Sequence, residues 1–278
     1  MGALLLMSLL IAQTTGTGTV DVDGGRIHYE VAGSGPVVVL VHGGFGDRRM
    51  WEAQFRELAK RYRVVRYDHR GFGKSSAPTA AYSPVDDLVA LLDRVGARKA
   101  HLVGNSLGGS LVLDAALKRP DRVASATMIA SSPSGFPVPK EDYESVAAVF
   151  EAVKTKGSAA AADLWFAHPM VAVTSRQANT RGLLRTMISD NASVFEMEHW
   201  PDEPMTPLAN ERLKEVKVPM LVVYGDRDVA TVQNGSKAAA AGIPGAKLAV
   251  IRGGDHLPQM THPVELNRVL LEFLDTAR

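Results

Sequence analysis

The stretch Gly104-Asn105-Ser106-Leu107-Gly108 decides how this sequence folds. It stands between an apolar run at residues 100–103, typical of a buried strand, and residues 109–118, whose pattern predicts a helix. A glycine at each end permits a turn too tight for side chains, and the serine falls at its apex. In such an elbow the hydroxyl points outward, and the amide of Leu107 faces the place where a substrate oxygen would gather charge. The stretch therefore predicts a strand, a tight turn and a helix, with Ser106 as a candidate nucleophile.

Composition limits the classes to which the chain can belong. Its 278 residues, 46% of them hydrophobic, can bury a large core and fit one α/β domain with an insertion better than two domains. The 31 Lys and Arg residues nearly balance the 30 Asp and Glu residues, so the net charge is close to zero. No overall positive potential would attract nucleic acid or an anionic membrane surface. The absence of Cys excludes disulfides, thiolate zinc sites and a cysteine nucleophile. The histidines show no metal-ligand spacing, so we expect no metal and no cofactor.

Strand-like runs alternate with helical patterns along the first half of the chain. Strands are predicted at residues 26–31, 37–41, 63–67, 100–103 and 123–129. Helices are predicted at residues 50–61, 84–95 and 109–118. Continuous β-branched and aliphatic runs are typical of buried parallel strands. The alternation therefore predicts an α/β fold with a mostly parallel central sheet flanked by helices and joined by right-handed crossovers.

This alternation stops after Ser131. A proline-rich patch beginning at Pro133 leads into a less regular segment with helical stretches at residues 143–154 and 159–166. Strand patterns resume at residues 220–224 and 247–251, and a final helix is predicted at residues 263–274. Helices inserted there would lie over the carboxyl ends of the strands, where open α/β sheets bind ligands. We therefore expect a core of residues 20–132 and 214–278, and a helical lid at residues 133–213, before the last two strands.

Residues 1–19 form an apolar N-terminal segment. Its run from Ala3 to Ala12 is too short to cross a bilayer, which needs about 20 residues, so no membrane span is expected. A secretory signal over residues 1 to about 15 would imply a secreted or periplasmic protein, but no Lys or Arg precedes the run. We favour a retained helix in a cytoplasmic protein. An exposed apolar run needs cover, so a homodimer through this segment is a further hypothesis.

Two side chains that could assist a serine follow the last two predicted strands. Asp228 ends Gly225-Asp226-Arg227-Asp228, and His256 ends Gly253-Gly254-Asp255-His256. A serine hydroxyl is a weak nucleophile near neutral pH, so an imidazole must take its proton and a carboxylate must orient the imidazole. Loops at the ends of parallel strands meet at one edge of the sheet. We therefore expect Ser106, an aspartate and His256 to converge, with Asp226 and Asp255 as alternatives to Asp228.

With these elements in place, the chain from about Val20 onward resembles the α/β-hydrolase fold family. That family uses the same serine elbow, the same Ser, Asp, His order along the chain and a lid in the same position. Its acid occupies the last position of Gly-x-x-Asp, so the resemblance implies Asp228. The stretch at residues 68–75, Asp-His-Arg-Gly-Phe-Gly-Lys-Ser, is similar to a family loop that shapes the floor near the site, which implies a structural role.

A second motif carries the resemblance further. Val41-His42-Gly43-Gly44-Phe45-Gly46 is similar to the family's His-Gly motif, in which the following residue supplies an amide to an oxyanion hole. The resemblance implies an oxyanion hole formed by the amides of Gly44 and Leu107. Loss of one such donor typically lowers the rate on the order of 100- to 1000-fold.

The identity of the apical residue selects the chemistry. Halide- and epoxide-opening branches of the family need an aspartate there, so Ser106 favours acyl transfer, as in a serine esterase or lactonase that acts on a small-molecule ester or lactone. Aromatic and Met side chains could line an apolar acyl pocket, although each could equally be packing in the core. The candidate substrate-binding residues are Phe45, Trp165, Met170 and Trp200.

The sequence does not identify the substrate. Acyl-homoserine lactones are one candidate, because they join an apolar tail to a hydrolysable ring. A carbon-carbon bond hydrolase of the same fold is the first alternative and would cleave vinylogous diketones while turning over nitrophenyl esters poorly. A ligand receptor with an intact triad and slow turnover is the second.

Overall fold

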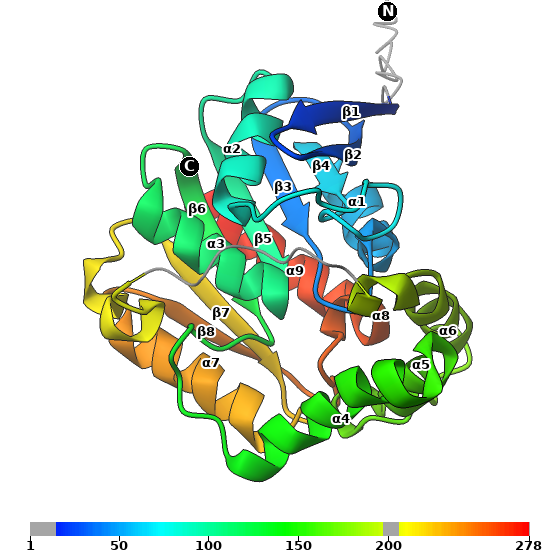
Figure 1. Ribbon diagram of the computed structural model, residues 1–278. Helices are drawn as coiled ribbons and strands as arrows, with labels where there is room; N and C mark the ends of the chain where they lie inside the picture. Colours follow the sequence, from blue (N-terminus) through cyan, green and yellow to red (C-terminus); the bar gives the residue numbers. More distant parts are fainter. Residues whose placement is uncertain (1–14, 197–205, 278) are drawn as a thin grey trace, which may run out of the picture.

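The computed structural model describes residues 15–196 and 206–277. Most of the apolar N-terminal segment and Trp200 lie outside these residues, so the predicted homodimer through that segment stays a prediction. Figure 1 shows a central twisted sheet with helices on both of its faces. The predicted fold class is thereby confirmed for the part of the chain that is described.

The sheet contains eight strands in the order β1-β2-β4-β3-β5-β6-β7-β8. They are β1 (Gly16–Val22), β2 (Gly25–Ala32), β3 (Val37–Val41), β4 (Arg63–Tyr67), β5 (Ala100–Asn105), β6 (Val123–Ile129), β7 (Met220–Gly225) and β8 (Lys247–Ile251). β1 pairs antiparallel with β2, and β2 pairs antiparallel with β4. All other pairs are parallel. The central strands are buried because helices cover both faces, which explains their continuous apolar sequences.

Successive side chains of one strand enter two different cores. In β3, Val38 and Leu40 face α1 (Glu52–Leu58) and α9 (Pro263–Thr276), whereas Val39 and Val41 face α2 (Pro84–Arg94) and α3 (Leu107–Lys118). α7 (Ala230–Gly242) packs on β7. The remaining helices are α4 (Lys140–Lys156), α5 (Ser158–Phe166), α6 (Arg181–Asp190) and α8 (Pro258–Thr261). Short 3-10 turns occupy Arg48–Trp51, Pro169–Val171, Ala192–Glu196, Ala209–Glu211 and Leu213–Glu215.

Helices α4, α5 and α6 interrupt the strand–helix alternation between β6 and β7. Figure 1 shows them grouped beyond the carboxyl ends of the strands, next to α8. Their buried side chains, including Val149, Trp165 and Met187, join the same hydrophobic core as β3 and α9. The inserted segment is thus packed on the body of the molecule. Among the helices of the described chain, none has the length and apolar character needed to cross a membrane.

Several elements differ from the sequence-based expectation. β1 begins at Gly16, inside the segment that was expected to precede the core, and only Val20 of its seven residues is buried. Such a strand has almost no hydrophobic signal, and its backbone pairing with β2 holds it in place. α7 was also not predicted, because its sequence is rich in Ala and small polar residues.

Candidate active site

The serine elbow lies between β5 and α3. Ser106 adopts φ 53° and ψ −116°, a left-handed backbone conformation that costs energy for a residue with a side chain. A Cβ at Gly104 would approach the carbonyl oxygen of Gly108 to 2.0 Å, and one at Gly108 would approach that of Val41 to 2.3 Å. The two glycines are therefore required by the close contact between the elbow, its helix and the neighbouring strand β3.

Three of the predicted residues are in direct contact. His256 Nε2 lies 2.8 Å from Ser106 Oγ, and His256 Nδ1 lies 2.8 Å from Asp228 Oδ2. The carboxylate can only accept, so Nδ1 donates to it and the unprotonated Nε2 can accept the serine hydroxyl. Burial lowers the pKa of His256, but the charge and hydrogen bond of Asp228 outweigh that effect and leave the pKa raised. The buried Asp228 carboxylate therefore favours the imidazolium that proton uptake from Ser106 would create.

The two alternative acids have other partners. Asp226 Oδ1 accepts a hydrogen bond from the backbone of Gly253 at 2.6 Å and so holds the loop before the histidine. Asp255 is fully buried and accepts from the backbone and hydroxyl of Thr174 at 2.7 and 2.8 Å. It ties the histidine loop to the inserted segment. Of the three aspartates, only Asp228 has a hydrogen bond to the imidazole.

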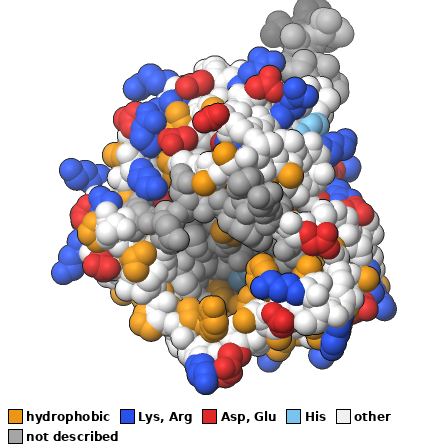
Figure 2. All heavy atoms as spheres, in the orientation of Figure 1, with side chains coloured by type: hydrophobic (Ala, Val, Ile, Leu, Met, Phe, Trp, Pro, Cys, Tyr) orange, Lys and Arg blue, Asp and Glu red, His pale blue; other side chains and the backbone are white. Residues whose placement is uncertain are grey.

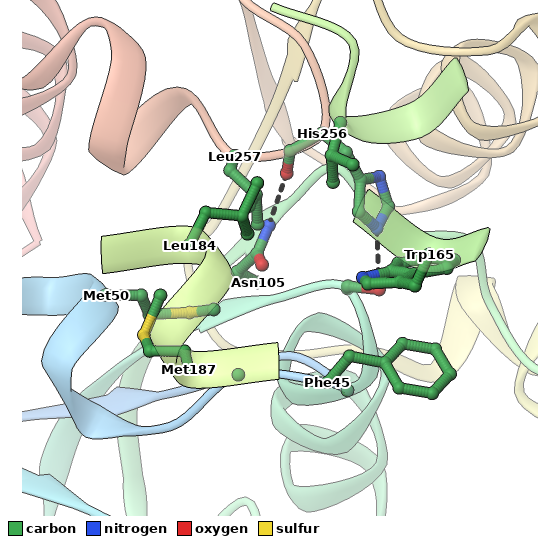
Figure 3. A pocket seen from close by; sticks show the side chains of 12 residues that line it. Phe45, Met50, Asn105, Trp165, Leu184, Met187, His256 and Leu257 are labelled. Carbon is green, nitrogen blue, oxygen red and sulfur yellow. Dashed lines mark hydrogen bonds between the residues drawn. The ribbon is translucent and has the colours of Figure 1, made fainter. Parts of the chain in front are cut away.

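The backbone of His256 is fixed from two sides. Its N–H donates to the carbonyl of Met170 in the inserted segment at 3.1 Å. Its carbonyl accepts from Asn105 Nδ2 at 2.9 Å, a contact drawn in Figure 3. No role was predicted for Asn105 from the sequence, although the residue lies inside the elbow. Nothing in the spacing of the chain indicates that the carboxamide reaches a loop 151 residues away.

The His-Gly loop is held by buried histidines. His42 Nδ1 donates to the carbonyl of Gly43 at 2.7 Å, and its Nε2 accepts from the backbone N–H of His69 at 2.9 Å. Burial lowers the pKa of both His42 and His69, which favours neutral rings at both positions. Asp68 accepts from the backbone of Arg48 at 2.9 Å and of Lys74 at 2.9 Å. The loop at residues 68–75 thus supports the loop that follows β3.

The two candidate oxyanion donors border the same cavity as Ser106. Gly44 and Leu107 both line it. Leu107 is the first residue of α3, so its amide has no acceptor within the helix and carries the partial positive charge of the helix N-terminus. After Gly44, Phe45 turns into the left-handed region with φ 59°. A Cβ on Gly44 would meet nothing within 4 Å, so packing does not require glycine there.

The candidate substrate-binding residues are distributed over two cavities that meet at Ser106. Phe45 and Trp165 line both, with their ring centroids 4.3 Å apart, and Met170 lines the larger one. Figure 3 shows Phe45 and Trp165 on the same side of the pocket as the ring of His256. Figure 2 shows hydrophobic side chains around a hollow on this face of the molecule. Trp200 lies outside the described residues, and Trp165 also belongs to the hydrophobic core.

No cluster of three His, Asp or Glu side chains that could hold a metal occurs among the residues that the structure describes. His168 stacks on Trp165 with centroids 4.9 Å apart, and burial together with the nearby His256 lowers its pKa. This histidine therefore contributes a neutral ring to the wall beside the candidate site.

The chain is similar to known proteins both in sequence and in structure. A family model described as the alpha/beta hydrolase fold matches residues 36–263. The chain is 28% identical over 268 residues to a putative carbamate hydrolase, RutD, of Azorhizobium caulinodans, covering 89% of this chain and 94% of the relative. It is 29% identical over 264 residues to a 2-hydroxy-6-oxononadienedioate/2-hydroxy-6-oxononatrienedioate hydrolase of Burkholderia vietnamiensis, covering 90% and 91%. A solved structure of Est816, described as an N-acyl homoserine lactone degrading enzyme, superposes with a TM-score of 0.76 at 27% identity, covering 92% of this chain and all of that one.

Proposed function

The chain belongs to the α/β-hydrolase fold family, and on that premise we propose that it is a serine hydrolase that cleaves carboxylic esters or lactones through an acyl-enzyme. The observation that carries the proposal is the continuous contact from Asp228 through His256 to Ser106, with 2.8 Å at each step. These are the contacts that a serine needs to lose its proton as it attacks. The residue at the apex of the elbow is a serine, which favours acyl transfer, and not the aspartate that halide- and epoxide-opening branches of the family need.

The proposed reaction has two halves. Ser106 Oγ attacks the carbonyl carbon while its proton passes to His256 Nε2, and Asp228 stabilises the resulting imidazolium. The C–O bond to the alcohol then breaks, and His256 returns the proton to the leaving oxygen. A water molecule next gives a proton to His256 and attacks the acyl carbon. The bond from that carbon to Ser106 Oγ then breaks, and His256 returns the proton to Oγ, which releases the acid and restores Ser106. In both tetrahedral intermediates the oxyanion would accept hydrogen bonds from the amides of Gly44 and Leu107.

The inserted helices would act as the lid of this site. We assign residues 133–213 to the lid and residues 20–132 and 214–278 to the core. Support comes from Trp165 and Met170, which belong to the inserted segment and line cavities that include Ser106. Phe45, Trp165 and Met170 would contact the apolar part of the substrate. A contact by Trp200 stays a prediction.

Relatives point to more than one substrate class. Acyl-homoserine lactones are a candidate because Est816, described as degrading them, shares 27% identity and the fold. The relatives described as a carbamate hydrolase and as an oxononadienedioate hydrolase are equally similar in sequence. A carbon-carbon bond hydrolase is therefore the second candidate function. It is distinguished by efficient cleavage of a vinylogous diketone together with poor turnover of simple esters.

One experiment tests the proposal directly. Nitrophenyl esters and lactones of graded acyl length are assayed with the wild type, with Ser106→Ala and with Ser189→Ala, an exposed serine on α6 as the matched control. Ser106→Ala should lose at least 1000-fold in kcat/KM, and Ser189→Ala should keep the wild-type value. Retention of more than one part in a thousand by Ser106→Ala would mean that another nucleophile acts. Multiple turnovers by the wild type would exclude a slow-turnover receptor.

A further inference from the structure

Two cavities of very different size meet at the Ser106 hydroxyl. Five buried apolar side chains line the inner chamber and not the outer cavity, and they are Met50, Val171, Leu184, Met187 and Leu257. The centre of a water molecule can occupy only about 10 Å³ of it, which is room for about one water. The outer cavity gives such centres about 400 Å³ and extends past Leu107 and Phe150, which are 47% and 36% exposed.

The inner chamber connects with the outer cavity at the reacting groups. Gly44, Phe45, Ser106, Trp165 and His256 line both spaces. Of the residues around the inner chamber, only Gly44, Phe45 and Ser106 are partly exposed, and the others are buried. A group that enters the chamber must therefore pass the Ser106 hydroxyl, and it can leave only by the same route.

The order of product release decides which part of the substrate fits which space. The alcohol must depart while the acyl group is still bonded to Ser106, and water must then reach the acyl carbon. An alcohol held in the inner chamber would have to pass the acyl group to leave. An alcohol in the outer cavity departs directly and vacates the space through which water arrives.

We propose that the inner chamber is the acyl subsite, and that Leu184 and Met187 restrict it to an acetyl group, with the larger alcohol part in the outer cavity. This inference rests on the proposed serine hydrolase function. It concerns open-chain esters, since in a lactone the acyl and alcohol parts are one ring. Figure 3 shows Leu184 and Met187 near Met50, on the far side of Asn105 from Trp165.

The wall that these two residues form is anchored to the core. Asn191, which follows α6, donates from Nδ2 to Asp47 at 3.0 Å and accepts at Oδ1 from the backbone of Gly73 at 2.7 Å. Both partners lie in loops of the core, and Asp47 is completely buried. Because the end of α6 is fixed in this way, Leu184 and Met187 cannot easily move outward to admit a longer chain.

The helix offers a matched pair of variants. Leu184 is 2% exposed in the chamber wall, whereas its neighbour Leu183 is 36% exposed. Nitrophenyl acetate, butanoate and octanoate, which share one leaving group, are assayed with the wild type, Leu184→Ala and Leu183→Ala. The wild type should prefer acetate over octanoate by at least 100-fold in kcat/KM. Leu184→Ala should reduce that preference at least tenfold, and Leu183→Ala should leave it unchanged.

These measurements distinguish a wrong assignment of the acyl subsite from a wrong assignment of the hydrolase function. If Ser106 is required but octanoate is hydrolysed as well as acetate, or if Leu184→Ala and Leu183→Ala have the same chain-length profile, the acyl subsite is wrong and the hydrolase function stands. If no ester is turned over in a Ser106-dependent manner, the function itself is wrong. Should Leu184→Ala fail to fold, Met187→Val opens the same wall, and an unchanged acetate preference in that variant overturns the inference.

Discussion

Asn105 donates a hydrogen bond from its side chain to the backbone carbonyl of His256 at 2.9 Å, so the residue before Ser106 holds the loop that carries the imidazole. A second, longer bond at 3.3 Å links the same nitrogen to the carbonyl of Ile129 on the neighbouring strand. The carboxamide thus connects the ends of β5 and β6 with the loop after β8. Such a connection can set the distance between His256 and Ser106 without contacting the substrate carbonyl.

Replacement of Asn105 should therefore affect the chemical step more than binding. Asn105→Ala removes the donor, and we expect kcat to fall about tenfold or more with little change in KM, because a lost bond of this kind is worth about 1 kcal/mol and leaves a buried carbonyl unpaired. Asn105→Asp should be worse above neutral pH, since an ionised carboxylate would face that carbonyl. Asn210→Ala on the partly exposed turn at Ala209–Glu211 is the control. An equal loss in kcat/KM that arises only from KM would contradict the positioning role.

The three aspartates near His256 can be separated by substitution. Asp228→Asn keeps the shape but removes the charge, and because the Val229 N–H needs the remaining oxygen, the amide nitrogen would face Nδ1 and favour the wrong tautomer, so kcat should fall by about 1000- to 10,000-fold. Asp226→Asn should cost less than tenfold, because Asp226 bonds only the Gly253 backbone on this loop. Steady-state kinetics of both variants on one ester decide the matter. A larger loss for Asp226→Asn than for Asp228→Asn would transfer the role of the acid to Asp226.

The pH dependence of activity follows from the protonation state of the His256 imidazole. His256 must be neutral to accept the serine proton, so activity should rise with pH as the ring deprotonates. Asp228 raises the pKa of His256 against the lowering effect of burial. The rise in kcat/KM should therefore be centred above about 6.5, the value of an unperturbed histidine. A profile that is flat between pH 5 and 9, or one centred well below 6.5, would argue against the imidazole as the base.

Much of this architecture was predictable from the sequence, for reasons that individual elements show. Strands β3 and β6 were predicted with the bounds that the structure has, because buried parallel strands are rich in apolar residues. β1 was missed because its place depends on backbone pairing with β2 and not on buried side chains. Helix α7 was missed because helices rich in alanine and small polar residues lack a clear apolar stripe.

In the candidate site, too, some residues were predictable from the sequence and others were not. Motif spacing identified Ser106 and His256, since the chemistry demands particular residue types at strand ends, and the structure brings them within 2.8 Å. It could not assign Asn105, Asp255 or Asn191, which act through hydrogen bonds to distant loops. Side chains that fix loops can be of several types and at many spacings. Such roles become visible only when the three-dimensional contacts are known.

A last prediction concerns stability and a carboxyl group outside the candidate active site. Asp114 lies on α3, and its Oδ1 is buried without a hydrogen-bond partner among the described residues. Burial raises the pKa of Asp114 to about 6, and the charge of Lys118 offsets only part of this effect. In the unfolded chain the same group titrates near 3.9. The folded protein therefore binds this proton more tightly than the unfolded chain, so stability decreases as pH rises from about 4 to about 6.

Above pH 6 the ionised Asp114 should destabilise the fold by about 1–3 kcal/mol, since one pKa unit corresponds to about 1.4 kcal/mol and the side chain is partly exposed. Asp114→Asn removes this charge, and its free energy of unfolding should exceed that of the wild type by that amount at pH 8, with the difference vanishing near pH 4. Urea unfolding at both pH values measures it. Asp121→Asn, at an exposed carboxylate whose pKa Arg119 lowers, should bring no such gain. A gain from Asp114→Asn that is the same at pH 4 and pH 8 would show that the carboxyl does not titrate in this range and that its burial carries no charge penalty.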